Sequence, residues 1–173
     1  MNKTYKIEIT LTNSKKIRLE LDTQYAPKTV EHFVNLVKQN YFDGTIFHRI
    51  IENFMIQTGG YLVEGNEIHV KEEKETIKGE FNANGFENNL RHVPGVISMA
   101  RTSDMNSASA QFFICSSFCP HLDGQYAAFG KTTDEESLET VMRISEAPTV
   151  NVGGGLTDFP YPVIYIQTIE KIK

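Results

Sequence analysis

Cysteine, positive charge and long apolar runs are all scarce in this sequence. It holds only 2 cysteines among 173 residues, and 17 Lys and Arg against 22 Asp and Glu give a net charge of −5. Nucleic-acid binders need clustered positive charge to neutralise phosphates, so we expect no nucleic-acid partner. No stretch reaches the ~18 consecutive apolar residues of a membrane helix, and the first residues lack the apolar segment of a signal peptide. We therefore expect a cytoplasmic protein with no membrane partner.

The two cysteines, Cys115 and Cys119, lie four positions apart. On one extended strand their Cα atoms would be about 13 Å apart, at ~3.3 Å per residue, which is too far for a disulfide. A turn after Ser116 would bring them into range, so spacing leaves both arrangements open. Two buried, reduced thiols are the expectation for a reducing compartment.

The chain shows no internal repeat, low-complexity tract or composition shift that would mark a linker. Its length suits one hydrophobic core. We predict a single domain over residues 1–173.

Alternating apolar and polar residues over 7–11 and 17–21, with Asn13-Ser14 between them, predict an opening β-hairpin. From Pro27 to about Asn40 the apolar residues recur with helical spacing, and proline suits a first helical turn. An amphipathic helix is predicted there.

Thr133-Asp134-Glu135-Glu136 matches a capping box, which predicts a second helix from Asp134 to about Glu146. Short β-rich runs bounded by turn residues account for much of the rest, and together they indicate a barrel or sandwich with two helices. These runs are 45–49, 54–57, 95–100, 111–115 and a closing strand at 163–166.

Three segments carry the chemistry. Residues 47–57 (FHRIIENFMIQ) place one guanidinium and one amide among large apolar side chains. This mixture indicates an apolar pocket with a hydrogen-bond donor directed into it. Residues 97–100 (ISMA) with 110–115 (AQFFIC), and 121–131 (HLDGQYAAFGK), add further apolar and amide groups. In these segments the chain resembles the cyclophilin family of peptidyl-prolyl isomerases, most closely its short bacterial single-domain members.

The resemblance implies a mainly β fold: a closed eight-stranded antiparallel barrel capped by two α-helices, with side chains filling the interior and the binding groove outside. It is convincing from about Pro27 to Lys131 and looser toward both ends. It also implies a monomer that binds proline-containing peptides and unfolded proteins.

Rotation about an X-Pro bond breaks no bond, so the implied catalyst needs no nucleophile, metal or cofactor. A donor aimed at the prolyl nitrogen stabilises the twisted amide. The resemblance assigns this role to Arg49, expected to be shielded from solvent, with Phe54 beside it and with Gln57 and Gln111 orienting the guanidinium.

The resemblance also assigns the substrate-binding residues. The proline pocket would consist of Phe54, Met55, Phe113 and Leu122, and strand alternation would turn one residue of each pair, Phe54-Met55 and Phe112-Phe113, toward the core. The main chain of Arg101 would bind the substrate backbone, with Ala100 and Thr102 lining the next subsite. His121 and Tyr126 complete the predicted set.

Several positions depart from the family pattern. His121 stands where many eukaryotic members carry tryptophan, which predicts weak cyclosporin binding, and Tyr126 stands where histidine is frequent. Thr58 and Ser109 replace glycines, which would alter loop backbone where φ is positive, and Met105 replaces a frequent proline.

The histidines show no metal-ligand spacing. The mixed-charge run 71–75 is typical of a solvated loop or edge. No Ser-His-Asp order is evident along the chain, although a triad formed in space remains open. Two other functions stay open as well. The first is a proline-binding module with little turnover, motivated by Thr58 and Ser109. The second is a small-ligand barrel with an open lumen.

Overall fold

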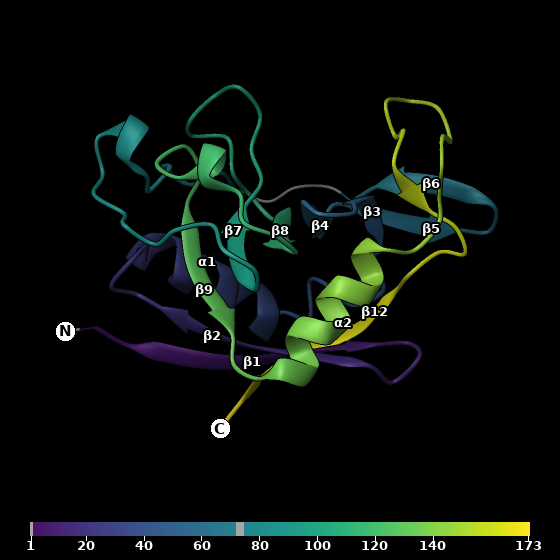
Figure 1. Cartoon of the computed structure of the whole chain (residues 1–173), viewed down its shortest axis with the longest axis horizontal. Coiled ribbons are helices and arrows are strands. Elements are labelled where there is room, and N and C mark those ends of the chain that lie inside the picture. The colour runs from purple at the N-terminus through teal and green to yellow at the C-terminus, as the bar shows by residue number, and fades with distance from the viewer. Residues whose placement is uncertain (1, 72–74) are drawn as a thin grey trace.

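The computed structural model describes residues 2–71 and 75–173, and its main element is an eight-stranded antiparallel sheet. The strand order is β12-β1-β2-β9-β7-β8-β4-β3 (Figure 1). The strands are β1 (Thr4–Leu11), β2 (Lys16–Asp22), β3 (Phe47–Ile51), β4 (Met55–Thr58), β7 (Val96–Met99), β8 (Phe112–Cys115), β9 (Ala128–Thr132) and β12 (Ile166–Ile172). The predicted opening hairpin, β1–β2, is confirmed.

The sheet curls strongly but does not close. Its edge strands β3 and β12 are not paired with each other as strands in the described chain; a single bridge, Ile46 with Tyr165, joins the segments before them. The Phe47 N–H also donates to the Ile164 carbonyl at 3.0 Å. The mainly β class with eight strands is confirmed, whereas a fully closed barrel overstates the pairing.

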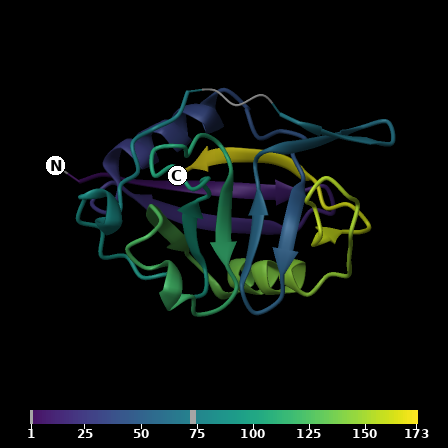
Figure 2. The same cartoon turned by 90° about the horizontal axis from the view of Figure 1, so that it is seen from above.

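Two helices cover the curled sheet on opposite sides (Figure 2). Helix α1 (Pro27–Lys38) packs on β2 and β12, and α2 (Glu135–Ser145) packs on β2, β3, β4 and β9. Both predicted helices are confirmed, and each ends one or two residues before its expected end.

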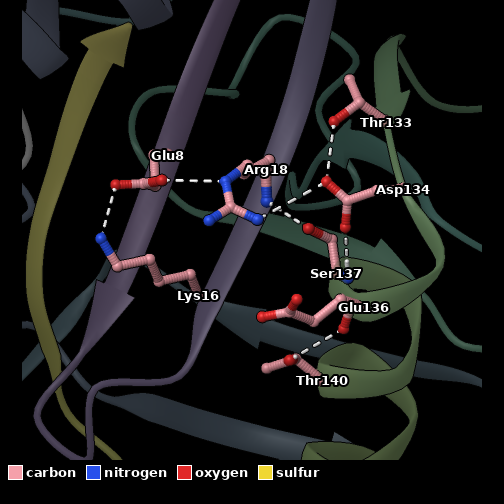
Figure 3. Close-up of polar contacts among 8 residues, drawn as sticks. All are labelled: Glu8, Lys16, Arg18, Thr133, Asp134, Glu136, Ser137 and Thr140. Atoms are coloured by element: carbon pink, nitrogen blue, oxygen red, sulfur yellow. Dashed lines mark hydrogen bonds and ion pairs between the residues drawn. The ribbon is translucent and has the colours of Figure 1, made fainter.

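The N-terminus of α2 is capped one position later than the sequence indicated. Asp134 is the N-cap: its Oδ1 accepts from the Ser137 N–H at 2.7 Å, while Thr133 only donates to the Asp134 carboxylate at 3.3 Å (Figure 3). The capping box starting at Thr133 is therefore wrong. Arg18 on β2 ties this helix end to the sheet, because its N–H donates to Ser137 Oγ at 2.7 Å and its guanidinium lies 3.7 Å from Asp134.

Aromatic rings fill the space between α1 and the sheet. The Phe33 ring lies 5.1 Å from those of Phe42 and Phe112 and 5.3 Å from that of Phe129. All four side chains are fully buried, and aliphatic residues of β1 and β2 complete the core. The side chains of the described residues pack the interior and leave no open lumen there, which argues against the small-ligand barrel.

The sequence missed two short hairpins, because the apolar residues of the first do not alternate regularly and the strands of the second have only two residues each. They are β5 (Tyr61–Glu64) with β6 (Glu67–Val70), and β10 (Thr149–Val150) with β11 (Phe159–Pro160). The closing strand was placed too early: β12 begins at Ile166, and residues 163–165 belong to the connection. Positions 72–74 of the mixed-charge run lie outside the described residues. None of the helices in the described chain has the length and apolar character needed to cross a membrane.

Candidate active site

The predicted site residues converge on one pocket at the outer face of the sheet, with an empty volume of about 430 Å³. Nine residues line it, and all nine belong to the predicted set: Arg49, Phe54, Met55, Gln57, Ala100, Arg101, Phe113, Leu122 and Tyr126. Gln111, Thr102 and His121 lie beside the pocket and are described below.

Strand register brings the central residues together. In the pairing of β3, β4 and β8, Arg49 lies opposite Gln57 and Gln57 lies opposite Phe113. Directly paired residues project on the same face of a sheet. The three side chains therefore form a row across three strands.

The floor of the pocket is apolar. Met55, Phe113 and Leu122 are buried and pack in a cluster with Cys115 and Cys119 behind them. Phe112 faces the core while Phe113 faces the pocket, as predicted. The same prediction is wrong for Phe54 and Met55, which both join the pocket cluster, because Phe54 precedes β4 and does not follow strand alternation.

The two cysteines are buried free thiols, as expected. Burial raises the pKa of each thiol, and for Cys115 the neighbouring Cys119 adds to the effect. Thiols held in the protonated form are poor nucleophiles. Cys115 and Cys119 therefore act as apolar packing behind the pocket.

Arg49 is oriented by an amide and an aromatic ring. Its Nη1 donates to Gln57 Oε1 at 3.4 Å, and the guanidinium carbon lies 5.9 Å from the centre of the Phe54 ring. Its side chain is exposed, so the expected shielding of Arg49 from solvent is wrong. Within the described residues no carboxylate forms an ion pair with Arg49, which leaves its charge available to a ligand.

A chain of hydrogen bonds continues inward from Arg49. Gln57 Nε2 donates to Gln111 Oε1 at 3.0 Å, so Gln111 acts through Gln57. The Gln111 side chain lies against Gly60, where a Cβ atom would approach to 2.4 Å, and only glycine leaves room for it. The sequence motif did not show this dependence on Gly60.

Behind Gln111 lies His48, which sequence reasoning did not place in the site. Its ring is buried, and the ring centre lies 4.3 Å from that of Tyr61, with the two planes tilted by 44°. Burial and the charge of Arg49 lower the pKa of His48 to about 4, and a hydrogen bond with Gln111 opposes them only in part. His48 is therefore neutral at pH 7 and adds no second charge beside Arg49.

The rim residues differ in how closely they approach the pocket. The Ala100 N–H donates to the Gln111 carbonyl at 3.0 Å, and Tyr126 meets the Phe113 ring edge-on at 5.7 Å. Thr102 is exposed and lies outside the pocket lining, with its N–H donating to Ser107 Oγ at 2.9 Å. Ala100 and Tyr126 thus border the pocket directly, and Thr102 flanks it.

His121 also lies just outside the pocket lining. Its ring is exposed and 5.5 Å from that of Phe54. It can cover one side of a ligand, with much less apolar area than an indole would offer.

A buried relay supports the floor and was not visible in the sequence. His92 Nδ1 and its own N–H both lie within hydrogen-bond distance of Asp123 Oδ1, at 3.0 and 2.7 Å, and Nε2 lies 2.9 Å from Ser98 Oγ. The arrangement matches a Ser-His-Asp triad in composition, but Ser98 is fully buried and out of reach of a substrate. Because the His92 ring stacks on Phe113 at 6.0 Å, the relay holds the pocket floor in place.

The family departures leave the groove intact. Thr58 lies within β4 and donates its hydroxyl to the Ile46 carbonyl at 2.8 Å, and Ser109 is buried with its hydroxyl on the Glu75 carbonyl at 3.2 Å. Neither has a positive φ, so no strained loop results. Met105 is exposed, away from the pocket.

An apolar notch, two linked amides and an exposed guanidinium on the outside of a curled sheet define a peptide-binding groove of the isomerase type. No cluster of metal-ligating side chains occurs among the described residues.

Comparisons with known proteins agree with this class. Residues 6–171 match the family model described as cyclophilin type peptidyl-prolyl cis-trans isomerase/CLD. The chain is 39% identical to peptidyl-prolyl cis-trans isomerase A of Dickeya dadantii, over 94% of this chain and 82% of that protein. It is 38% identical to the isomerase cyp18 of Streptomyces antibioticus, over 73% of this chain and 76% of that protein.

Among solved structures, a cyclophilin type isomerase of Cryptosporidium parvum superposes with a TM-score of 0.77 at 26% identity, covering 99% of both chains. A crystal structure of the same protein in the presence of the dipeptide Ala-Pro gives a TM-score of 0.75 at 27% identity, covering 97% of this chain and 99% of that one. The chain belongs to the cyclophilin family and is a peptidyl-prolyl cis-trans isomerase.

Proposed function

We propose that Arg49 accelerates X-Pro rotation by donating a hydrogen bond to the prolyl nitrogen as the amide twists. Twisting localises the nitrogen lone pair, so a donor stabilises the transition state more than the planar ground state. The uncatalysed barrier is ~18–20 kcal/mol; lowering it by ~5–7 kcal/mol corresponds to about four to five powers of ten in rate. The observation that supports the proposal is an exposed guanidinium beside an apolar notch, oriented by Gln57 and without an acidic partner in the described chain.

The proline ring would bind in the notch formed by Phe54, Met55, Phe113 and Leu122. Holding the ring fixes one side of the bond while the preceding residue turns toward Arg49. The relay from Asp123 to Ser98 through His92 keeps the notch rigid, so less ordering is needed when a peptide binds. The substrates would be exposed proline-containing segments of unfolded proteins, as suits a folding enzyme.

Four further expectations belong to this proposal. The chain acts as a monomer in the cytoplasm and is organised as a single domain. Cyclosporin binds weakly, because the exposed imidazole of His121 offers less apolar area and no indole N–H.

Direct measurement of cis–trans exchange tests the mechanism. Two-dimensional NMR exchange on an Ala-Pro peptide with micromolar protein should show acceleration, and Arg49→Ala should lower kcat/KM by roughly 10²–10³-fold, the usual loss for one aimed transition-state donor. Arg143→Ala is the matched control, because it removes an exposed arginine of α2 far from the pocket and should leave exchange unchanged.

Unfolding midpoints and circular dichroism of the variants show whether the fold is kept. An Arg49→Ala enzyme that is folded and fully active would refute the proposal. Tight peptide binding by the parent without faster exchange would instead favour a binding module.

A further inference from the structure

Two of the side chains that line the pocket carry a charge, and both are arginines. Arg49 belongs to β3 and Arg101 follows β7, while the remaining lining residues are neutral. This contrasts with the net charge of −5 of the whole chain. The groove is therefore a local positive site on an acidic protein.

The Arg101 guanidinium is held between aromatic rings from two separate loops. Its central carbon lies 4.9 Å from the centre of the buried Phe81 ring and 4.7 Å from that of Tyr126. Phe81 precedes the short helix η1 (Asn82–Asn84), and Tyr126 precedes β9. Such stacking favours a planar guanidinium over an ammonium group.

Hydrogen bonds fix its rotation as well. Arg101 Nε and Nη2 donate to the Gln125 carbonyl at 3.1 and 2.8 Å, and Nη1 donates to the Thr102 carbonyl at 2.9 Å. These bonds engage three of the five N–H groups that a guanidinium has, which leaves donors for a ligand. All the acceptors are neutral carbonyls, so they orient the side chain without cancelling its charge.

No carboxylate in the described chain forms an ion pair with Arg101. Other arginines do have such partners: Arg18 lies beside Glu8 and Asp134, and Arg143 beside Glu139. A positioned and uncompensated charge at a binding groove favours a ligand of opposite sign, and it loses little side-chain freedom on binding.

We propose that Arg101 makes this groove selective for segments in which an acidic side chain lies next to the proline. This inference rests on the proposed function, because it concerns the peptides that the same groove turns over. It adds a role for the Arg101 side chain to that expected of its main chain. A lysine next to the proline would be disfavoured by the charge of Arg101.

Tetrapeptides that differ only beside the proline provide the test. Ala-Xaa-Pro-Phe and Ala-Pro-Xaa-Phe, with Xaa as Glu, Gln or Lys, are compared by NMR exchange at low ionic strength. At the position before the proline, the position after it, or both, kcat/KM for the Glu peptide should exceed that for the Gln peptide by a factor of about 2–5, as expected for one partly exposed charge pair. At the same position, kcat/KM for the Lys peptide should be lower than that for the Gln peptide. Because salt screens such pairs, the preference should shrink as ionic strength rises.

Substitution at the site separates Arg101 from the general field of the protein. In Arg101→Gln the Glu-to-Gln ratio should fall to about 1, while Arg101→Lys, which keeps the charge, should retain a ratio above 1. Arg143→Gln makes the same change in net charge far from the groove and should keep the parent ratio. No preference for Glu in the parent, or the same preference in Arg101→Gln, would overturn the inference.

Failure of the proposed function is distinguishable from failure of this inference. Turnover of the Gln peptides, and its loss in Arg49→Ala, tests the isomerase mechanism, whereas the Glu-to-Gln ratio tests Arg101 alone. If no peptide is turned over, dissociation constants of the same peptides give the same ratio. Equal binding of the Glu and Gln peptides would then reject selectivity.

Discussion

A buried histidine lies behind the polar residues of the groove. His48 lies behind Gln111, which binds Gln57, which in turn orients Arg49. Its Nδ1 has no hydrogen-bond partner within the described chain, so the bond with Gln111 is not matched by a second contact that would stabilise a charged ring. A charged His48 would also repel Arg49. The groove is therefore arranged for a neutral imidazole.

Acid should destabilise the protein through His48. The folded-state pKa of about 4 lies below the ordinary value of 6.5, so between these values the unfolded chain binds more protons and stability falls as pH falls. From pH 7 to pH 4.5 the free energy of unfolding of the parent should drop by about 2 kcal/mol more than that of His48→Leu, measured by urea unfolding. The exposed His69→Gln should follow the parent, and parallel curves for the parent and His48→Leu would contradict the assignment.

The two helices begin with different kinds of cap. The N-cap of α2 is local, with Asp134 accepting from Ser137. Although partial burial would raise the pKa of Asp134, the Ser137 and Thr133 hydrogen bonds and the charge of Arg18 hold it below its ordinary value. The N-cap of α1 is Ala26, which has no side-chain acceptor. The acceptor comes from Glu80, far along the chain.

Glu80 should therefore contribute more to stability than an ordinary cap. Its buried carboxylate accepts from the Thr29 N–H and hydroxyl at 2.7 and 2.8 Å and from the Lys28 N–H at 3.3 Å. Glu80→Ala leaves these donors buried and should cost about 2–3 kcal/mol, whereas Asp134→Ala, at a more exposed cap, should cost about 1 kcal/mol. Urea unfolding of both variants measures the difference. Equal losses of unfolding free energy in the two variants would show that Glu80 contributes no more than an ordinary N-cap.

Over the whole molecule, the sheet separates a core on one face from a groove on the other. Phe112 contacts the rings of Phe33 and Phe42 inside, and its neighbour Phe113 lies between His92 and Tyr126 outside. One dipeptide thus serves both stability and binding, because successive side chains of a strand point to opposite faces.

Matched substitutions should separate the two roles. Phe112→Leu removes buried core contacts and should lower the free energy of unfolding by roughly 1–3 kcal/mol, with KM changed little. Phe113→Leu should mainly raise KM, because it removes the aromatic floor of the notch. Unfolding curves and peptide exchange kinetics on the two variants provide the measurement, and the reverse pattern would show that the faces are assigned wrongly.

Prediction from sequence succeeded where the signal was local. The hairpin, both helices and the strands at 95–100 and 111–115 follow from apolar spacing, and motif residues such as Arg49, Gln57 and Phe113 do lie in one pocket. It failed where the position of an element depended on its partners. β12 starts only at the last residue of the apolar run 163–166 that was expected to form it, and the two edge strands of the sheet do not pair with each other in the described chain.

The amino-acid sequence by itself determined the β-rich class, the family and the residues that line the groove, because apolar periodicity and short motifs involve residues that are close together in the chain. Only the tertiary structure decided which distant groups meet. The Glu80 cap joins residues 51 positions apart, His92 and Asp123 are 31 apart, and Arg101 lies between rings from two separate loops. Such contacts form only when the packed sheet brings those segments together, and no local pattern in the sequence predicts them.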